Sequence, residues 1–359
     1  MKIAQIAPLY ESVPPKLYGG TERVVSYLTE ELVRLGHEVT LFASGDSVTS
    51  ARLDSGCEKA LRLTGTYKDP LAYHTVMLDR VLMRAHEFDV LHFHTDYTHF
   101  PATRNLQLPT VTTLHGRLDL PDLVLLYQHF ARERLVSISQ AQRQPLRRVN
   151  WVANVYHGLP MNLYRASPNR GDYLAFLGRI SPEKRPDRAI RIAQKAGMTL
   201  KIAAKVDEVD RQYFETEIEP LLDARGIEYL GEINETQKNS FLGNAYAYLF
   251  PIDWPEPFGL GMIEAMACGT PTIAFRCGSV PELIDDGVTG FSVQTEEQAV
   301  EALKRVPTLS RAKCRATFER RFTAWRMAKD YLSVYHALVH DLPLPYAVHS
   351  GELSPTVVS

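Results

Sequence analysis

Short apolar runs alternate with helical patterns along the first half of the chain. Each run is apolar at consecutive positions rather than at every second one, and residues 71–86 between two of the runs have helix-like spacing. Continuous apolar strands separated by helices are typical of a parallel sheet that is covered on both faces. The pattern therefore predicts an α/β domain whose strands lie at residues 2–8, 37–44, 89–94, 109–116 and 134–139.

A second series of the same kind begins after the polar segment at residues 169–171, with a helix at 186–197. Its strands are expected at 172–180, 199–206, 227–233, 246–251 and 270–275. Two successive blocks of this kind indicate two doubly wound, Rossmann-like α/β domains that face a cleft. We expect domains at 1–168 and 169–320, a helix at 321–342 that packs back toward the first domain, and a loose tail at 343–359.

The composition narrows the class of protein. Hydrophobic residues make up 45% of the 359 positions and charged residues 23%, as in ordinary soluble enzymes. The formal net charge of −2 provides no field that would attract nucleic acid, so no nucleic-acid partner is expected. The four cysteines lack metal-finger spacing, and neither a signal peptide nor a run of about 18 apolar residues is evident. We therefore expect a soluble, cytoplasmic protein with free thiols.

One charge interrupts an apolar segment in the second half of the chain. Between residues 257 and 268 every position is apolar or small except Glu264. Helical spacing places Glu264 on the inward side, where an unpaired carboxylate is costly. Two interpretations are open. Either the diol of a ligand such as a ribose donates to the carboxylate, or an Arg or Lys of the core pairs with it.

The turn before this helix also suits an anionic or sugar ligand. Glu256 lies in it, eight positions before Glu264. The backbone N–H groups of Phe258, Gly259 and Leu260 face the space beyond the helix N-terminus, where phosphate or sugar oxygens are good acceptors. We expect Glu256 to point toward whatever occupies that space.

The segment E-P-F-G-L-x-x-x-E-A-M-A-C-G-T-P resembles the Glu-x7-Glu signature of the retaining glycosyltransferases of family 4, which have the GT-B fold. The resemblance covers nearly the whole chain because other landmarks occur in the same order. It implies that Glu256 lies near the hydroxyls of the donor sugar and that Glu264 binds the ribose of the nucleotide. It also implies that the donor binds mainly to the second domain and the acceptor to the first.

Two further landmarks are implied to lie near the donor phosphates. Gly19 and Gly20 let the backbone approach a ligand closely, and Thr21 can cap the helix that follows, although most such glycine pairs are only turns. Arg179 and Lys184 follow the first strand of the second domain, where open α/β sheets bind ligands. Two cations there suit a departing diphosphate. Without the two glutamates, a solvated charge pair would be the simpler interpretation.

Histidines mark the first-domain side of the expected cleft. The resemblance places His115 near the donor sugar, where it would orient the reacting carbon, although a lone histidine at a strand end also fits a structural role. His94 and Asp96 are expected to line the acceptor side. His92 and His94 share one face of a strand, which is compatible with a metal site. The family needs no metal and no further ligand is evident, so none is expected.

The remaining landmarks are loops. The resemblance implies that the loop containing Gly231 and Ile233 holds the nucleobase, largely through its backbone. Glu282, after the signature helix, is expected to cap the short helix that follows it. Tyr156-His157-Gly158 stands where the family commonly has Pro-Asn-Gly, so we expect His157 to contact donor or acceptor in a different way.

Basic residues gather late in the chain, with Glu319 as the only carboxylate among them. A solvated helix face is the plain interpretation, and contact with an anionic lipid surface is the alternative, so peripheral membrane contact is possible but not indicated. The residues are Lys304, Arg305, Arg311, Lys313, Arg315, Arg320, Arg321 and Arg326.

Together these features predict a glycosyltransferase, with a hexosyl group favoured, that moves a sugar from a nucleotide-diphosphate sugar to a hydroxyl acceptor without a cofactor. A UDP or GDP donor is expected. The resemblance implies same-face attack through an oxocarbenium-like state, with the diphosphate, held by Arg179 and Lys184, taking the acceptor proton. A nucleotide-sugar epimerase, a glycan phosphorylase and a silent nucleotide-binding module are the rival interpretations. The acceptor (glycan, lipid or small molecule) and the oligomeric state stay open.

Overall fold

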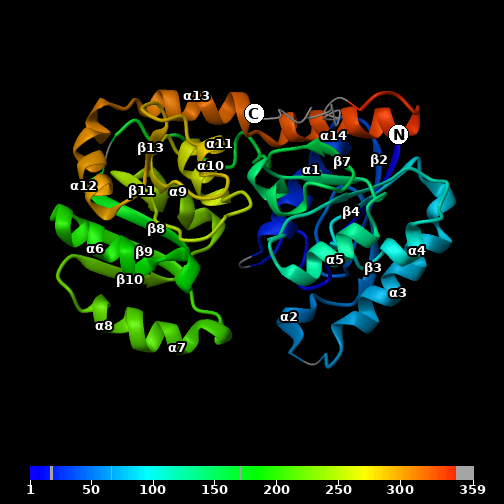
Figure 1. Ribbon diagram of the computed structural model, residues 1–359, viewed down its shortest axis with the longest axis horizontal. Helices are drawn as coiled ribbons and strands as arrows, with labels where there is room; N and C mark the ends of the chain where they lie inside the picture. Colours follow the sequence, from blue (N-terminus) through cyan, green and yellow to red (C-terminus); the bar gives the residue numbers. More distant parts are fainter. Residues whose placement is uncertain (17–18, 66, 170, 345–359) are drawn as a thin grey trace, which may run out of the picture.

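The computed structural model describes residues 1–16, 19–65, 67–169 and 171–344. They form two lobes, each built on a wholly parallel sheet with helices on both faces (Figure 1). The predicted pair of doubly wound α/β domains is thereby confirmed. Position 170, in the expected break between the domains, and residues 345–359 of the expected tail lie outside the described residues.

The first domain has a seven-stranded sheet in the order β3-β2-β1-β4-β5-β6-β7. Ile3 lies at its centre, paired with Val39 on one neighbouring strand and Val90 on the other, and is fully buried. The strands are β1 (Lys2–Ile6), β2 (Glu38–Ser44), β3 (Arg52–Cys57), β4 (Val90–Phe93), β5 (Thr110–Thr113), β6 (Leu135–Ser137) and β7 (Trp151–Asn154).

The second domain repeats this topology with one strand fewer, in the order β10-β9-β8-β11-β12-β13. In both sheets the order reverses beside the first strand, between β1 and β4 and between β8 and β11. Open α/β sheets bind ligands outside the carboxyl ends of the strands at such a switch point. The strands are β8 (Tyr173–Arg179), β9 (Thr199–Lys205), β10 (Ile227–Gly231), β11 (Ala247–Phe250), β12 (Thr272–Phe275) and β13 (Gly290–Val293).

Three observed strands, β3, β7 and β13, have no counterpart among the predicted ones. Each lies at an outer edge of its sheet, where one side of the strand has no neighbour. β3, with the sequence RLDSGC, has no fully buried residue. An edge strand can be stable with little apolar sequence because it is only partly covered, so a search for continuous apolar runs misses it.

Helices cover both faces of the two sheets. Those of the first domain are α1 (Gly20–Arg34), α2 (Leu61–Thr64), α3 (Pro70–Met83), α4 (Phe100–Thr103) and α5 (Pro121–His129). Those of the second are α6 (Pro186–Ala196), α7 (Arg211–Tyr213), α8 (Glu219–Leu222), α9 (Glu235–Gly243), α10 (Leu260–Ala267), α11 (Val280–Leu283), α12 (Glu296–Arg305) and α13 (Arg311–Arg321). Within the described residues, no helix combines the length and the apolar character needed to cross a membrane.

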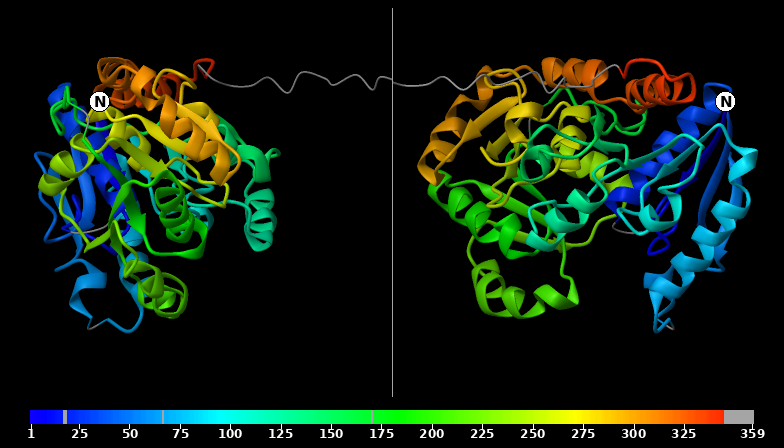
Figure 2. Two further views of the ribbon diagram at one scale, coloured as in Figure 1. Left: turned by 90° about the vertical axis from the view of Figure 1, so that its left-hand side faces the viewer. Right: turned by 45° about the vertical axis from the view of Figure 1, so that its right-hand side comes forward.

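The last helix, α14 (Ala324–Val339), returns to the first domain. α13 packs against α10, whereas α14 packs against α1, so the pair runs along the top of both lobes (Figures 1 and 2). Tyr331 and Tyr335 of α14 are buried in the first-domain core. The chain crosses between the domains a second time at this point, and a bridge between Leu159 and Thr323 holds the two crossings together.

Candidate active site

A cleft of about 690 Å³ lies between the two domains. Its walls come from the segment after β1, the ends of β5, β8 and β9, and the start of α10. These are the carboxyl ends of parallel strands in both sheets, so the topology alone brings them together. The sequence-predicted residues that line the cleft are Gly19, Gly20, His115, His157, Arg179, Lys184, Ile233, Glu256, Phe258, Gly259, Leu260 and Glu264.

The turn into α10 depends on glycine. Gly259 has a φ of +86°, a backbone conformation that side chains disfavour. A Cβ atom there would also lie 2.7 Å from the Met262 side chain and 3.1 Å from Phe250. The helix that follows is buried along almost its whole length, and Glu264 is 2% exposed. The chain therefore buries this carboxylate at the floor of the cleft.

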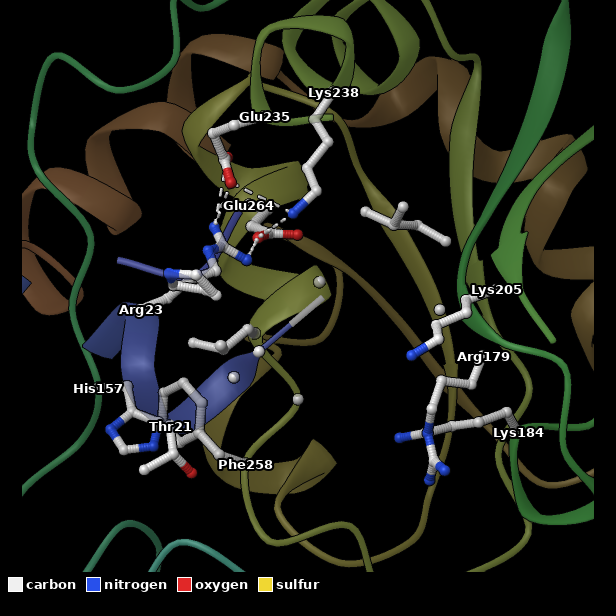
Figure 3. A pocket seen from close by; sticks show the side chains of 18 of the residues that line it. Thr21, Arg23, His157, Arg179, Lys184, Lys205, Glu235, Lys238, Phe258 and Glu264 are labelled. Atoms are coloured by element: carbon white, nitrogen blue, oxygen red, sulfur yellow. Dashed lines mark hydrogen bonds and ion pairs between the residues drawn. The ribbon is translucent and has the colours of Figure 1, made fainter. Parts of the chain in front are cut away.

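Glu264 is not left for a ligand alone, because basic side chains already surround it. Arg23 of α1 lies 2.6 Å from its Oε1 atom and Lys238 of α9 lies 3.5 Å from the same atom (Figure 3). Burial on its own would raise the pKa of this carboxyl, but Lys238 and Arg23 lower it to about 2. The interpretation in which basic core residues pair with Glu264 is therefore correct for this structure.

Arg23 was missed by the sequence analysis, although it lies only two positions after the predicted Gly-Gly-Thr segment. It also pairs with Glu235 at 3.1 Å, and the Tyr164 hydroxyl contacts Glu235 as well. Arg23 belongs to the first domain and the two glutamates to the second. This cluster is therefore an ion-paired bridge between the domains at one end of the cleft.

Three cations point into the opposite end of the cleft, from Arg179, Lys184 and Lys205 (Figure 3). Arg179 ends β8 and Lys205 ends β9, and the two residues are partners in the sheet register. Arg179 also pairs with Glu183 at 3.0 Å, and Lys205 pairs with Asp207 at 2.8 Å. Lys205 was not predicted. The signal that could have found it is its place near the end of the strand expected at 199–206, which matches the place of Arg179 at the end of the strand expected at 172–180.

Lys184 forms an ion pair with Glu256 and lies 5.1 Å from the centre of the Trp254 ring. The Trp254 indole N–H donates to the same Glu256 oxygen at 3.0 Å. A turn around Gly278 packs against this loop so closely that a Cβ on Gly278 would lie 2.3 Å from the Glu256 backbone nitrogen. Glu256 is thus held within the second domain, at the same end of the cleft as the three cations.

His115 and His157 form the first-domain wall beside this loop. Their rings stack with centroids 5.3 Å apart, and the His157 ring lies 4.8 Å from Phe258. Burial lowers the pKa of His115 to about 3 and holds the pKa of His157 well below its usual value, so both rings are neutral. A neutral imidazole can both donate and accept a hydrogen bond, which suits the hydroxyls of a sugar.

Four expectations about individual positions are corrected by the structure. His94 lies behind His115 rather than in the cleft wall, with its Nδ1 atom 2.9 Å from Nε2 of His115. Asp96 is exposed at the turn after β4, outside the cleft lining. Gly231, with a φ of +68°, lies just outside the cleft lining, which begins at the next residue of this loop. Thr21 lies inside the first turn of α1 and does not cap it, because Gly19 is the N-cap residue.

Glu282 caps a helix of the other domain instead of its own. Its carboxylate accepts hydrogen bonds from the backbone N–H groups of Gln140 and Ala141, both at 2.7 Å, and from the Tyr156 hydroxyl at 3.0 Å. The first two open the short helix at Ala141–Leu146 in the first domain. The side chain therefore ties the domains together outside the cleft.

The basic residues late in the chain are not one solvated face. Lys304 and Arg320 are exposed, but Arg311 is buried and donates to the carbonyls of Gly243 and Ala245 at 2.6 and 3.0 Å. Arg315 donates to the carbonyl of Ala267 at 2.9 Å. The backbone carbonyls at helix and loop ends need donors. Much of the basic charge is therefore used to close the second domain, which explains the cluster without a lipid surface.

The described residues contain no group of three or more His, Cys, Asp or Glu side chains arranged to hold a metal ion. His92, which the sequence analysis considered as a ligand, is buried and contacts Tyr335 and Thr113 through its two ring nitrogens, at 2.6 and 2.7 Å. Carboxylates of the cleft lining pair instead with basic side chains, as Glu256 does with Lys184 and Asp207 does with Lys205.

Two Rossmann-like domains that face a ligand cleft define the GT-B class of protein. The family model described as "Glycosyltransferase Family 4" matches residues 18–172, and the family model described as "Glycosyl transferases group 1" matches residues 165–320. The two matches together run through well over half of the chain. The protein therefore belongs to the group 1 glycosyltransferases, the family that the Glu256–Glu264 segment had indicated.

Individual relatives agree with this assignment. The chain is 32% identical to a D-inositol 3-phosphate glycosyltransferase of Saccharomonospora viridis over an alignment of 184 positions, which covers 44% of this chain and 41% of that protein. The fold matches the crystal structure of AviGT4, a glycosyltransferase involved in avilamycin A biosynthesis, with a TM-score of 0.75 and 22% identity over 94% of this chain and 98% of that one. It also matches HepE of Anabaena in complex with UDP-glucose, with a TM-score of 0.72 and 18% identity over 94% and 100% of the chains.

Proposed function

We propose that the protein transfers a sugar from a nucleotide-diphosphate sugar, in its UDP form, to a hydroxyl acceptor, with retention of configuration and without a metal ion. The observation that carries this proposal is the arrangement of charge in the cleft. A carboxylate occupies one end, three cations converge on the other, and a second carboxylate stands beside the cations. A nucleoside diphosphate sugar has hydroxyls, phosphates and hydroxyls in the matching order.

The ribose would bind at Glu264. The contacts of Glu264 with Arg23, Lys238 and Tyr164 are all made by its Oε1 atom, which leaves its Oε2 atom to accept from a ribose hydroxyl. The ion pairs keep the carboxylate charged, and a charged acceptor makes hydrogen bonds about twice as strong as a neutral one does. The countercharge from the first domain thus makes Glu264 a better ribose acceptor, because it removes the cost of burying an unpaired charge.

The diphosphate would bind at Arg179, Lys184 and Lys205. A phosphate oxygen competes with Glu256 for the Lys184 ammonium, and donor binding would therefore release Glu256 to accept from a hydroxyl of the sugar. Three cations neutralise much of the charge that develops on a departing diphosphate, which is the work that a divalent metal would otherwise do. The observation supports a metal-independent reaction.

The proposal of retention rests on the resemblance to the retaining family. The resemblance to the retaining family implies attack from the face that the diphosphate leaves, through an oxocarbenium-like state, with a phosphate oxygen taking the acceptor proton. The neutral rings of His115 and His157 stand across from the cations and would hold the sugar hydroxyls. The UDP form of the donor is favoured because HepE, which shares this fold, was crystallised with UDP-glucose.

Thermal unfolding with UDP, GDP and ADP tests the donor site. A nucleotide at about 100 times its dissociation constant stabilises the folded protein by roughly 2.7 kcal/mol. We expect UDP to raise the midpoint, and Glu264→Gln to abolish most of the rise. Glu235→Gln is the matched control because it also removes a partner of Arg23 but keeps Glu264, so the rise should persist. A protein that none of the three nucleotides stabilises would contradict the proposed function.

A further inference from the structure

The two carboxylate oxygens of Glu256 have different surroundings. Its Oε2 atom accepts from the ammonium of Lys184 and, at 3.0 Å, from the indole N–H of Trp254. Its Oε1 atom has no hydrogen-bond partner among the described residues and is not fully buried. Glu256 lines the cleft, and its side chain is 11% exposed. One oxygen is therefore anchored to the protein, and the other is left for a ligand in the cleft.

Trp254 and Glu256 belong to one three-residue turn with Pro255 at its centre. The backbone N–H of Glu256 donates to the carbonyl of Trp254 at 2.7 Å, which closes the turn. Proline fixes its own φ at about −65°, so it restricts the backbone between the two side chains. The sequence Trp-Pro-Glu thereby places an indole beside a carboxylate through local structure.

The turn is also tied to the loop that contains Lys184. The backbone N–H of Asp253 donates to the carbonyl of Glu183 at 2.9 Å, and the Asp253 carboxylate pairs with Arg185 at 2.7 Å. These contacts involve the residues on either side of Lys184 and not its own side chain. The Lys184 side chain can therefore turn toward a phosphate while the backbone of both loops stays in place.

The two donors to Oε2 of Glu256 differ in charge and in freedom. Lys184 carries a cation on a flexible stem, and the diphosphate of the proposed donor would attract it. The indole N–H of Trp254 is neutral, only donates, and moves only with its ring. A phosphate would therefore take Lys184 away from Glu256 and leave the indole where it is. Among the described residues, Trp254 would then be the remaining anchor of this carboxylate.

We propose that Trp254 is a positioning residue whose indole N–H holds Oε2 of Glu256, so that Oε1 faces a hydroxyl of the donor sugar while the diphosphate holds Lys184. The proposal rests on the proposed function, because that function supplies both the sugar and the diphosphate. Trp254 acts through Glu256 and need not touch the sugar. Without the indole N–H, the carboxylate would lose its fixed partner at the stage when the sugar is bound.

The first test follows the indole N–H itself, in ¹H–¹⁵N spectra of the full chain. The sequence has three tryptophans, and Trp254→Phe assigns the resonance. We expect the Trp254 N–H to exchange slowly with water in the free protein and also with saturating UDP, whose diphosphate would hold Lys184. The N–H of Trp325, a residue that is 48% exposed, is the reference for fast exchange. A Trp254 N–H that exchanges fast once UDP is bound would overturn the proposal.

Kinetics then separate a positioning role from a merely structural one. A hydrogen bond to a charged group commonly changes an equilibrium by about tenfold to a hundredfold. For Trp254→Phe we expect kcat/KM to fall by about tenfold or more in the hydrolysis of a UDP-hexose, a transfer to water that needs no acceptor. The substrate is whichever of UDP-glucose, UDP-galactose and UDP-N-acetylglucosamine the wild type hydrolyses fastest. The dissociation constant for UDP, which has no sugar for Glu256 to contact, should be unchanged.

Two further variants isolate the N–H from the ring. Trp254→β-(3-benzothienyl)alanine keeps the shape of the side chain and has sulfur in place of the N–H, so it should show the same loss as Trp254→Phe. Trp151→Phe removes an indole N–H that donates to the carbonyl of Leu146 at 2.8 Å, outside the cleft lining, and should show no loss.

Three results would overturn the proposal. They are an unchanged kcat/KM in Trp254→Phe, full activity in the benzothienyl variant, and an equal loss of affinity for UDP and for the UDP-hexose. The last result would mean that the ring only supports the loop. Failure of the proposed function would show separately, as the lack of any effect of UDP on the unfolding of the wild type.

Discussion

Glu256 and Glu264 are eight positions apart in the chain, yet the structure holds them in opposite ways. Glu264 lies on a buried helix, and its strongest ion pair, at 2.6 Å, comes from Arg23 of the other domain. Glu256 lies in a loop, and its partners, Lys184 and Trp254, belong to its own domain. One carboxylate therefore depends on how the two domains meet, whereas the other does not.

The difference assigns the two ends of the cleft different tasks. Separating the domains would remove Arg23 from Glu264 and leave a buried charge with less compensation, so under the proposed function the Glu264 end of the cleft would link nucleoside binding to domain arrangement. Under the same proposal, the pair of Lys184 and Glu256 would exchange its partners for phosphate and sugar without any domain movement. Substitutions at the first end should thus affect stability most, and those at the second end should affect turnover.

The largest effect is expected for Arg23→Met. It removes a guanidinium that pairs with both Glu264 and Glu235, and removing one member of a buried ion pair commonly costs about 3–5 kcal/mol. Because Lys238 remains near Glu264, we expect a loss of about 3 kcal/mol in the free energy of unfolding, measured with a chemical denaturant. Arg34→Met on the same helix removes only an exposed pair with Glu31 and should cost well under about 1 kcal/mol. Equal losses in the two variants would show that the buried pair of Arg23 and Glu264 stabilises the protein no more than an exposed pair does.

Lys184→Ala should have its effect on turnover. Loss of one charge-stabilising group at a transition state commonly lowers kcat by about 10²-fold or more, and we expect this from initial rates at saturating nucleotide sugar. The free energy of unfolding should fall less than in Arg23→Met, since Glu256 keeps the Trp254 N–H. Lys195→Ala, which removes an ion-paired lysine of the same domain outside the cleft lining, is the control. Near-normal turnover in Lys184→Ala would exclude Lys184 from the reaction.

The effect of pH is confined to acid solution and is absent near neutrality. The pKa of Glu264 is lowered from its ordinary 4.5 to about 2, because Lys238 and Arg23 outweigh the burial that would raise it. A carboxyl with a depressed pKa contributes stability that is present above its unfolded value and is lost as the pH falls through the folded value. Between pH 4.5 and about 2, the wild type should therefore lose stability more steeply than Glu264→Gln. Denaturant unfolding at several pH values measures both slopes, and parallel curves would contradict the ion pair.

Local sequence patterns determined the interior of the fold. Continuous apolar runs marked the central strands of both sheets because such strands are buried on both faces, while the edge strands β3, β7 and β13 needed no such run. The same patterns identified Glu256, Glu264 and the glycine turn between them. These features depend on residues within one strand, turn or helix, so the sequence contains their signal at short range.

Only the tertiary structure decided which polar and charged side chains meet. Arg23 and Glu264 are 241 positions apart, and Gln5 and Tyr335, whose side chains share a hydrogen bond, are 330 apart. No short-range pattern specifies such pairs, because they depend on how two domains pack and on where the last helix returns. For the same reason Glu264 could be recognised as an unusual buried charge from the sequence, but its partner could not. Lys205 became part of the site because the register of two parallel strands places it beside Arg179.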